Sequence, residues 1–183
     1  MKQRKKRRKS VHALIDKIET AFAEVIYPGD NNLTDSTYGE EPAALVEEFR
    51  GKADWRALDA AFLDQAPDGW CSALSFFSGS ALKFYLPAYL IADLKGQLQT
   101  ADPGFRLCWG VTPMAAGKKI AKAWGGGTIG ESTSAQFELF DAAQVAAIVD
   151  YLWWKLESLG GYDPTIEQAL ENYWLPREHL AGQ

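Results

Sequence analysis

The sequence predicts a mainly α-helical protein built as one compact domain, and three observations lead to this prediction. A strongly apolar stretch near the middle of the chain, residues 79–95, has the composition of a buried helix. Amphipathic stretches with helix-capping residues lie on both sides of it. The length of 183 residues fits one domain, and we find no internal repeat. We therefore expect roughly six helices packed around the one at 79–95, within a single helical domain spanning residues 10–183.

The central helix begins after Ser78, whose hydroxyl can accept a hydrogen bond from the free N–H groups of the first turn. Phe77 and Leu82 occupy the two positions of a hydrophobic staple around that cap. The apolar residues that follow are Leu82, Phe84, Tyr85, Leu86, Tyr89, Leu90, Ile91 and Leu94. They cover more than one face, so we expect other helices on several sides. Pro87 lacks a backbone donor, which predicts a kink or a break in the helix.

The N-terminal half contains shorter helical signals. Ser10 is predicted to cap a first helix with an apolar stripe at i, i+3, i+4 and i+7 spacing. The stripe consists of Val11, Leu14, Ile15, Ile18, Phe22 and Val25. Pro28 and Gly29 fit the central positions of a type II turn, and a polar loop follows at 31–41. Further helices are expected from Pro42 and after Asp54.

The C-terminal third contains the clearest local signals. Asp141 and Gln144 make a capping-box pattern ahead of an amphipathic helix that stops at Gly160. Asp163 is predicted to cap a last helix, which Pro176 should end. Residues 97–134 have no clear periodicity, and the pattern there also allows a small strand pair near 105–109 and 136–140.

Charge is distributed unevenly along the chain. The formal net charge is −5, and seven of the nineteen basic residues lie in the first nine positions. These are Lys2, Arg4, Lys5, Lys6, Arg7, Arg8 and Lys9. The remaining residues contain 12 basic and 24 acidic side chains, a net charge of −12. We expect residues 1–9 to form a disordered basic arm on an acidic body, because so charged a stretch can bury little apolar surface.

Composition and charge also exclude several classes of protein. Lys83 and Asp93 interrupt the apolar stretch, which is shorter than the ~20 residues that a membrane-spanning helix needs. The segment after the basic arm contains Asp16 where a signal peptide would be apolar. Cys71 and Cys108 are too few for a disulfide scaffold. We expect a cytoplasmic protein with no membrane partner.

Several motifs resemble those of a bacterial family of uncharacterised conserved proteins. The matching residues are Ala21-Phe, Tyr27-Pro-Gly-Asp30, Gly51-Lys, Trp55 with Leu58, Leu74-Ser-Phe, Tyr85-Leu-Pro-Ala-Tyr-Leu90, Gln144 and Tyr173-Trp174. The resemblance runs from about residue 14 to about residue 175 and implies a bacterial origin and one cytosolic domain. That family is a domain of unknown function, so the resemblance implies no activity, cofactor or catalytic residue. The basic arm and the Gly- and Lys-containing segment at 106–130 depart from it.

No reaction signature is present, so we predict no catalytic, cofactor-binding or metal-binding residues. His12, Cys71, Cys108 and His179 lack the close pairing of zinc ligands. The glycine run at 125–130 is followed by Glu131, where a phosphate-binding loop would avoid negative charge, and is predicted to be a flexible linker. The sequence around Ser78 does not fit the Gly-x-Ser-x-Gly frame. Glu167 and Glu171 fall on a solvated helix face.

Two features are candidates for binding a partner. Trp153 lies beside the predicted inner face of its helix and Trp154 points largely away from it. Such tryptophans are most often covered by the same domain, but tryptophan is also enriched at interface hot spots. Asp30 and Asp35 in the polar loop are the acidic candidates.

The leading functional hypothesis is a non-enzymatic, adaptor- or immunity-like protein that binds another macromolecule, most simply another protein. The alternative is weak, non-specific binding of nucleic acid through the basic arm, whose lysines and arginines would contact phosphates. An enzyme of unknown class is the third hypothesis.

Overall fold

The computed structural model describes residues 10–36, 38–65, 72–122 and 125–181. The longer helices are α1 (Val11–Ala21), α2 (Glu40–Phe49), α5 (Gly79–Leu94), α8 (Ile129–Phe137) and α9 (Ala142–Ser158). The shorter helices are α3 (Ala60–Gln65), α4 (Ser72–Phe76), α6 (Pro103–Cys108), α7 (Pro113–Ala116), α10 (Pro164–Ala169) and α11 (Leu175–Ala181). Single helical turns form η1 (Asp30–Asn32), η2 (Trp55–Ala57), η3 (Trp109–Val111) and η5 (Leu170–Trp174). The predicted mainly helical fold is confirmed.

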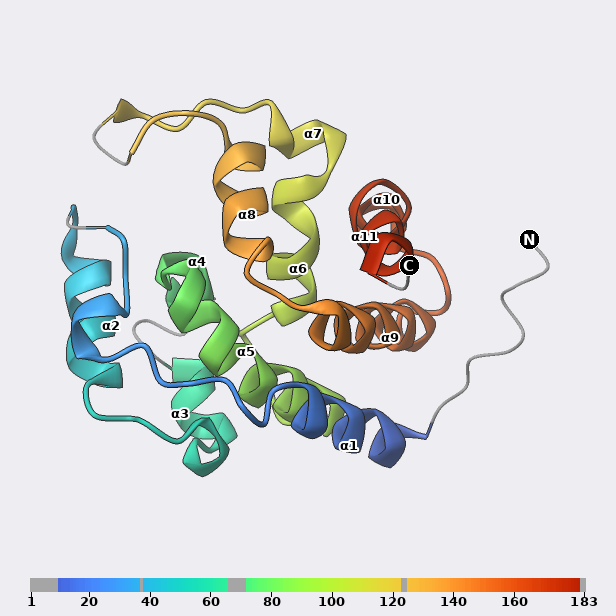
Figure 1. The fold of residues 1–183 in the computed structure, drawn as a ribbon, viewed down its shortest axis with the longest axis horizontal. Helices are drawn as coiled ribbons and strands as arrows, with labels where there is room; N and C mark the ends of the chain where they lie inside the picture. Colours follow the sequence, from blue (N-terminus) through green and yellow to red (C-terminus); the bar gives the residue numbers. More distant parts are fainter. Residues whose placement is uncertain (1–9, 37, 66–71, 123–124, 182–183) are drawn as a thin grey trace.

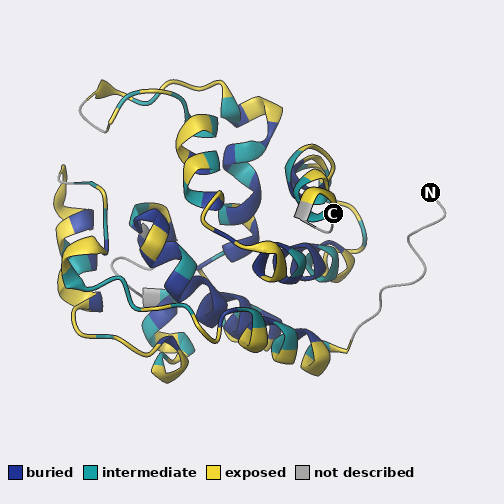
Figure 2. Ribbon diagram, viewed as in Figure 1, coloured by how far each residue is buried: buried dark blue, intermediate teal, exposed yellow. Residues whose placement is uncertain are grey.

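Helix α5 is the centre of the core, as predicted. Figure 2 shows it as the most buried helix, and only Ser80, Lys83 and Asp93 along it are not buried. Helices α1, α3, α6 and α8 and the turn η2 all contact it. Ser78 caps it by accepting a hydrogen bond from the N–H of Ala81 at 3.1 Å. The helix continues through Pro87, so of the predicted kink or break the break does not form.

The remaining helices pack around α5 in three groups, of which α6, α7 and α8 form one. Figure 1 shows α2, α3 and α4 on one side and α1 and α9 on the other, with α10 and α11 over α9. Helix α9 begins with the predicted capping box of Asp141 and Gln144. Leu86, Tyr89, Leu152 and Trp174 are fully buried in one hydrophobic core, as predicted.

The strand pair considered near 105–109 and 136–140 is wrong. The described residues contain only isolated bridges, Thr34 with Phe77 and Lys119 with Thr128. Residues 105–109 lie in α6 and η3, because the Asp102 side chain accepts the N–H of Phe105 at 3.0 Å and starts a helix with Pro103 in its first turn. Residues 136–140 include the end of α8. That helix begins with a capping box formed by Thr128 and Glu131.

Three local predictions also need correction. The helix expected after Asp54 is divided into η2 and α3. Gly29 has φ 85° and ψ 153°, whereas a type II turn needs ψ near 0°, so that turn does not form. The last helix does not end at Pro176, because η5 is a π-helical turn in which the N–H of Leu175 donates to the carbonyl of Leu170. The wider turn changes the hydrogen-bond register just before Pro176, so its missing N–H is tolerated at the start of α11.

None of the described helices is long and apolar enough to span a membrane. The basic arm at residues 1–9 and Cys71 lie outside the described residues.

Candidate functional site: an aromatic–lysine surface

The segment from α6 to α7 places two aromatic rings together at the surface. Phe105 and Trp109 are four residues apart, so a helical path through α6 and η3 brings them to the same face. Their rings stack with centroids 5.5 Å apart and an interplanar angle of 18°. Phe105 is 50% exposed, and Met114 on α7 is 62% exposed. Large apolar side chains therefore remain in contact with water here.

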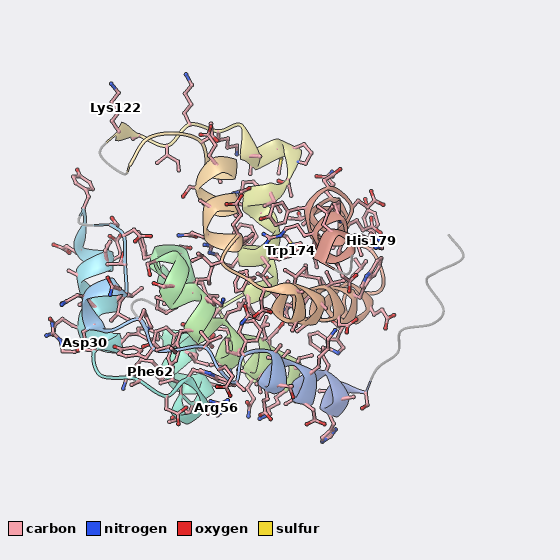
Figure 3. All side chains as sticks on the ribbon, viewed as in Figure 1. Asp30, Arg56, Phe62, Lys122, Trp174 and His179 are labelled. Carbon is pink, nitrogen blue, oxygen red and sulfur yellow. The ribbon has the colours of Figure 1, made fainter. Side chains whose placement is uncertain are left out.

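A lysine lies against this ring stack. The Lys118 ammonium is 4.8 Å from the centroid of the Trp109 ring, within the range of a cation–π interaction. Lys119 and Lys122 are exposed on the hairpin that follows, and Figure 3 shows Lys122 at the outer end of that hairpin. We call Phe105, Trp109, Met114, Lys118, Lys119 and Lys122 the aromatic–lysine surface.

Backbone hydrogen bonds fix the hairpin to the start of α8. The N–H of Ile129 donates to the carbonyl of Lys118 at 2.9 Å, and the N–H of Ile120 donates to the carbonyl of Gly127 at 3.0 Å. Gly110 allows η3 to approach α8 closely, since a Cβ there would lie 2.2 Å from the Thr133 hydroxyl. These contacts determine the position of the lysines relative to the rings.

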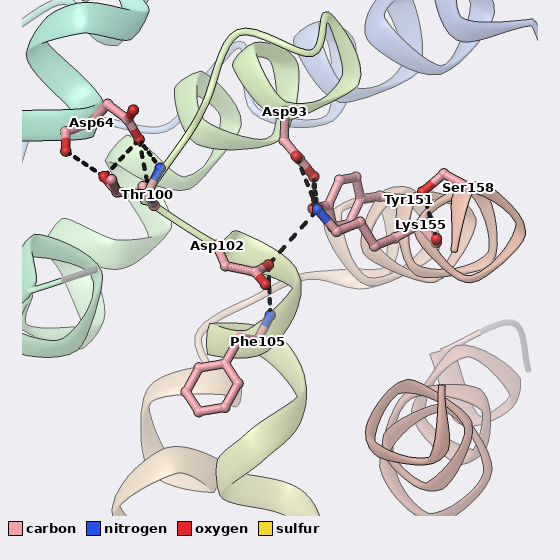
Figure 4. Close-up of polar contacts among 9 residues, drawn as sticks. Asp64, Asp93, Thr100, Asp102, Phe105, Tyr151, Lys155 and Ser158 are labelled. Carbon is pink, nitrogen blue, oxygen red and sulfur yellow. Dashed lines mark hydrogen bonds and ion pairs between the residues drawn. The ribbon is translucent and has the colours of Figure 1, made fainter. Parts of the chain in front are cut away.

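A polar cluster inside the molecule holds α6 in place, as Figure 4 shows. The Lys155 ammonium on α9 donates to both carboxylate oxygens of Asp93 on α5, at 2.8 and 2.9 Å. It also lies 3.9 Å from the carboxylate of Asp102, the cap of α6. Tyr151 donates its hydroxyl to Asp93, and burial, reinforced by that carboxylate, raises the pKa of Tyr151. The tyrosine therefore remains protonated, and the cluster joins three helices.

The loop before α6 is fixed by a second carboxylate. Asp64 accepts hydrogen bonds from the N–H groups of Gln99, Thr100 and Ala101 at 2.8–2.9 Å (Figure 4). Burial alone would raise the pKa of Asp64, but these backbone donors outweigh it and lower that pKa. The chain is thus held at residues 99–102, immediately before α6.

Arg106 is directed inward from the same helix. Its guanidinium donates to the carbonyl of Leu74 at 2.7 Å and to the side chain of Gln136, and lies 5.3 Å from the Phe137 ring. Burial lowers the pKa of Arg106 to about 10, so it keeps its charge at neutral pH. Neutral groups therefore surround this charge.

Two adjoining surface hollows lie elsewhere, near the start of α5, with volumes of about 390 and 420 Å³. Ser80 and Leu139 line both. Ser80 and Lys83 are three residues apart on α5, a spacing that some enzymes use for a serine nucleophile and a lysine base. Here the Lys83 ammonium donates to the carbonyl of Leu139 at 2.6 Å, while the Ser80 hydroxyl lies 3.1 Å from that of Ser78. Both side chains have structural partners.

The structure separates the residues predicted to bind a partner. Trp153 and Trp154 on α9 are partly buried against the core, and the Trp154 ring lies 5.8 Å from that of Tyr151. The Asp30 carboxylate accepts from the Tyr27 hydroxyl and the Gly51 N–H, and these bonds lower its pKa. Asp35 is exposed at the edge of one hollow.

Asp30 and Asp35 belong to the segment between α1 and α2, whereas the two tryptophans belong to α9, so the four do not form one cluster. The seven basic arm residues lie outside the described residues.

The aromatic–lysine surface is not among the sites predicted from the sequence. Two signals pointed to it: an aromatic pair at helical spacing, and a stretch from 103 to 130 with four basic residues and no acidic one. A strand over residues 105–109 would also place Phe105 and Trp109 on one face. It would not predict the helix cap at Asp102 or the contact between Trp109 and Lys118.

Within the described residues, no group of three or more His, Cys, Asp or Glu side chains could hold a metal ion. Cys108 is buried, and burial raises the pKa of its thiol. No curated protein and no solved structure matches the chain. A family profile does match residues 10–178, nearly the whole chain after the basic arm, and on that match the chain belongs to a family of unknown function, DUF6714.

Proposed function

We propose that this protein is a non-enzymatic, adaptor- or immunity-like module that binds another protein through the aromatic–lysine surface. The observation that carries the proposal is the half-exposed ring of Phe105, stacked on Trp109 with Lys118 over the second ring. Rigid aromatic side chains provide large contact areas at low entropic cost, and interfaces are enriched in them.

The potentially reactive side chains described above already have structural partners, which supports a binding function over catalysis. Tyr151, Asp93 and Lys155 satisfy one another inside the molecule, and Ser80 and Lys83 each have a structural partner. The aromatic–lysine surface, in contrast, presents side chains that protein partners contact favourably. The proposal includes a cytoplasmic site of action in a bacterium, an expectation that rests on the resemblance described above and on the low cysteine content.

The test is capture of partners from a native cell extract on the immobilised full chain, with and without nuclease. We expect a protein that is retained after nuclease treatment and lost with Phe105→Ser. Tyr162→Ser is the matched control, because Tyr162 is also an exposed aromatic residue but lies between α9 and α10. Retention by Phe105→Ser equal to wild type, or loss of all retained protein on nuclease treatment, contradicts the proposal.

A further inference from the structure

We infer that the segment recognised by the aromatic–lysine surface is an acidic peptide segment that carries an aromatic or long apolar side chain. This inference rests on the proposed function and specifies the chemistry of its partner. It is drawn from the local charge, the fixed position of Lys118 and the exposed apolar side chains of the two preceding helices.

Local charge is the first argument. Residues 103–130 contain four basic residues and no acidic one, while residues 10–183 as a whole carry 12 basic and 24 acidic residues. An acidic segment would be repelled by most of the domain and attracted here, so the charge distribution directs such a ligand to this surface.

The acidic residues that flank this stretch are engaged elsewhere. Asp102 accepts the N–H of Phe105 and lies near the Lys155 ammonium. Glu131 accepts the N–H of Thr128 at 2.8 Å in the capping box of α8. Arg106, whose partners are the neutral carbonyl of Leu74 and the amide of Gln136, adds an uncancelled positive charge next to Phe105 in the chain. Neither flanking carboxylate is therefore paired with a lysine of the aromatic–lysine surface.

Lys118 is placed in advance of binding. Lys118 is held over the Trp109 ring, and its carbonyl is bonded to the first residue of α8. Because the backbone is fixed, less conformational entropy is lost when a carboxylate binds. Phe105 and Met114 lie on the two helices before the lysines, so a segment with a few carboxylates and one apolar side chain could contact both kinds of group. The flexible methionine can adapt to apolar side chains of different shape.

A protein segment fits this surface better than a nucleic acid does. Three exposed lysines would displace roughly two or three counterions from a polyphosphate, which gives weak binding at moderate salt. The acidic body would repel the rest of a long polyanion. A peptide with two or three carboxylates places its charge only where the lysines lie.

The test begins with selection from a peptide display library on the full chain. We expect wild type to enrich peptides that combine Asp or Glu with an aromatic residue, Leu or Met. The double variant Lys118→Glu/Lys119→Glu should instead enrich peptides with Lys or Arg. Fluorescence polarisation with a selected acidic peptide should show binding at least about tenfold weaker for the double variant and for Phe105→Ser.

Lys95→Glu, an exposed lysine at the end of α5, is the charge control and should bind the peptide like wild type. Circular dichroism and thermal midpoints establish that each variant is folded. If the double variant is destabilised, Lys119→Glu alone replaces it, because that side chain is exposed and lies beyond the ring stack.

Four results would overturn the inference. Peptides enriched without acidic residues, or a charge reversal that leaves the selected charge unchanged, contradict it. So does a single-stranded oligonucleotide that binds more tightly than the peptide and displaces it. Self-association that requires Phe105, with no peptide selected, would identify the occupant as a second copy of the chain instead.

The capture experiment separates this inference from the proposed function. A partner that is lost with Phe105→Ser but retained by Lys118→Glu/Lys119→Glu supports the proposed function and rejects the acidic segment. A partner retained by both variants rejects the proposed function itself.

Discussion

At the scale of single residues, several charged side chains of this protein are held by groups from distant elements. Lys155 and Asp93 form an ion pair whose side chains are only 16% and 13% exposed. Lys17 on α1 pairs with the buried Asp150 on α9 at 2.5 Å and donates to the carbonyl of Ala146. Such pairs contribute little net stability by themselves, but removing one partner leaves a charge in a poorly hydrated position.

The first prediction concerns Lys155. Lys155→Met should lower the free energy of unfolding by about 3–5 kcal/mol, because among the described residues the Asp93 carboxylate then keeps only the Tyr151 hydroxyl as its partner. Arg50→Met is the control, since the pair of Arg50 with Glu47 is exposed and should contribute at most about 1 kcal/mol. Urea denaturation measures both. Equal effects of the two substitutions would show that the Asp93 site is well hydrated.

The second prediction concerns the pH dependence that arises from Asp64. Backbone donors lower the pKa of its carboxyl in the folded state, so its stabilising contribution exists above the unfolded pKa of about 4. That contribution is lost as the pH falls through the folded-state pKa. Asp64→Asn should therefore be less stable than wild type at pH 7, and the difference should shrink as the pH falls below about 4. Thermal midpoints followed by circular dichroism measure this. A difference that stays constant down to pH 2 would contradict it.

At the scale of elements, close contacts between short segments position the aromatic–lysine surface. A Cβ at Gly110 in η3 would lie within 2.9 Å of three Thr133 side-chain atoms, and a Cβ at Gly130 in α8 would lie 2.9 Å from the Ala116 carbonyl oxygen. The packing of η3 and α7 on α8 therefore depends on residues without side chains. The ring stack and the lysine hairpin are attached to these same elements.

The third prediction tests the contact between η3 and α8. Gly110→Ala should lower the free energy of unfolding by about 1–3 kcal/mol, because the new methyl group displaces α8 from η3. Gly117→Ala is the matched control, since Gly117 has φ −80° and no atom lies within 4 Å of the position that its new methyl group would take. That substitution should be neutral or slightly stabilising. Urea denaturation of both variants provides the measurement. A Gly110→Ala protein as stable as Gly117→Ala would reject the close contact.

The fourth prediction tests the central position of α5. Leu86→Ala should lower the free energy of unfolding by about 2–5 kcal/mol, because Leu86 is fully buried and its removal leaves a cavity. Leu180→Ala, at an exposed position on α11, should change it by less than about 0.5 kcal/mol. An unchanged denaturant midpoint for Leu86→Ala would be incompatible with the core described above.

At the scale of the whole molecule, opposite charges are separated along the chain. The first nine residues carry seven basic side chains, and the rest of the chain has a net charge of −12. An acidic body repels phosphates while the arm attracts them, and the two effects oppose one another within one molecule. Binding of nucleic acid through the arm should accordingly be weak and strongly dependent on salt.

The fifth prediction concerns deletion of residues 2–9. The free energy of unfolding should not change, because these residues contain seven charges and no apolar side chain. Titration of a fluorescent oligonucleotide should give a log–log salt slope of at most roughly −5 to −6 for the full chain, and no measurable binding after the deletion. Tight binding that survives the deletion would instead locate a nucleic-acid site on the body and favour the alternative function.

Local sequence signals determined the beginnings of several helices and the identity of the core. The caps at Ser10, Ser78, Asp141 and Asp163 are confirmed, because a cap needs only its own side chain and the next few N–H groups. The burial of α5 also follows from composition, since a helix that is apolar on more than one face must be covered by others. These features depend on neighbours in the sequence, and a single sequence contains that information.

Only the tertiary structure decided the candidate site and the contacts that hold it. Asp93 and Tyr151 are 58 residues apart in the chain, and Arg106 and Leu74 are 32 apart. The π-helical turn before Pro176 and the division of the helix after Asp54 likewise depend on packing as well as on local propensity. Lys118 reaches Trp109 only because α7 and the hairpin are fixed on α8. Contacts between segments arise from close packing of the whole chain, which local periodicity and capping patterns do not encode.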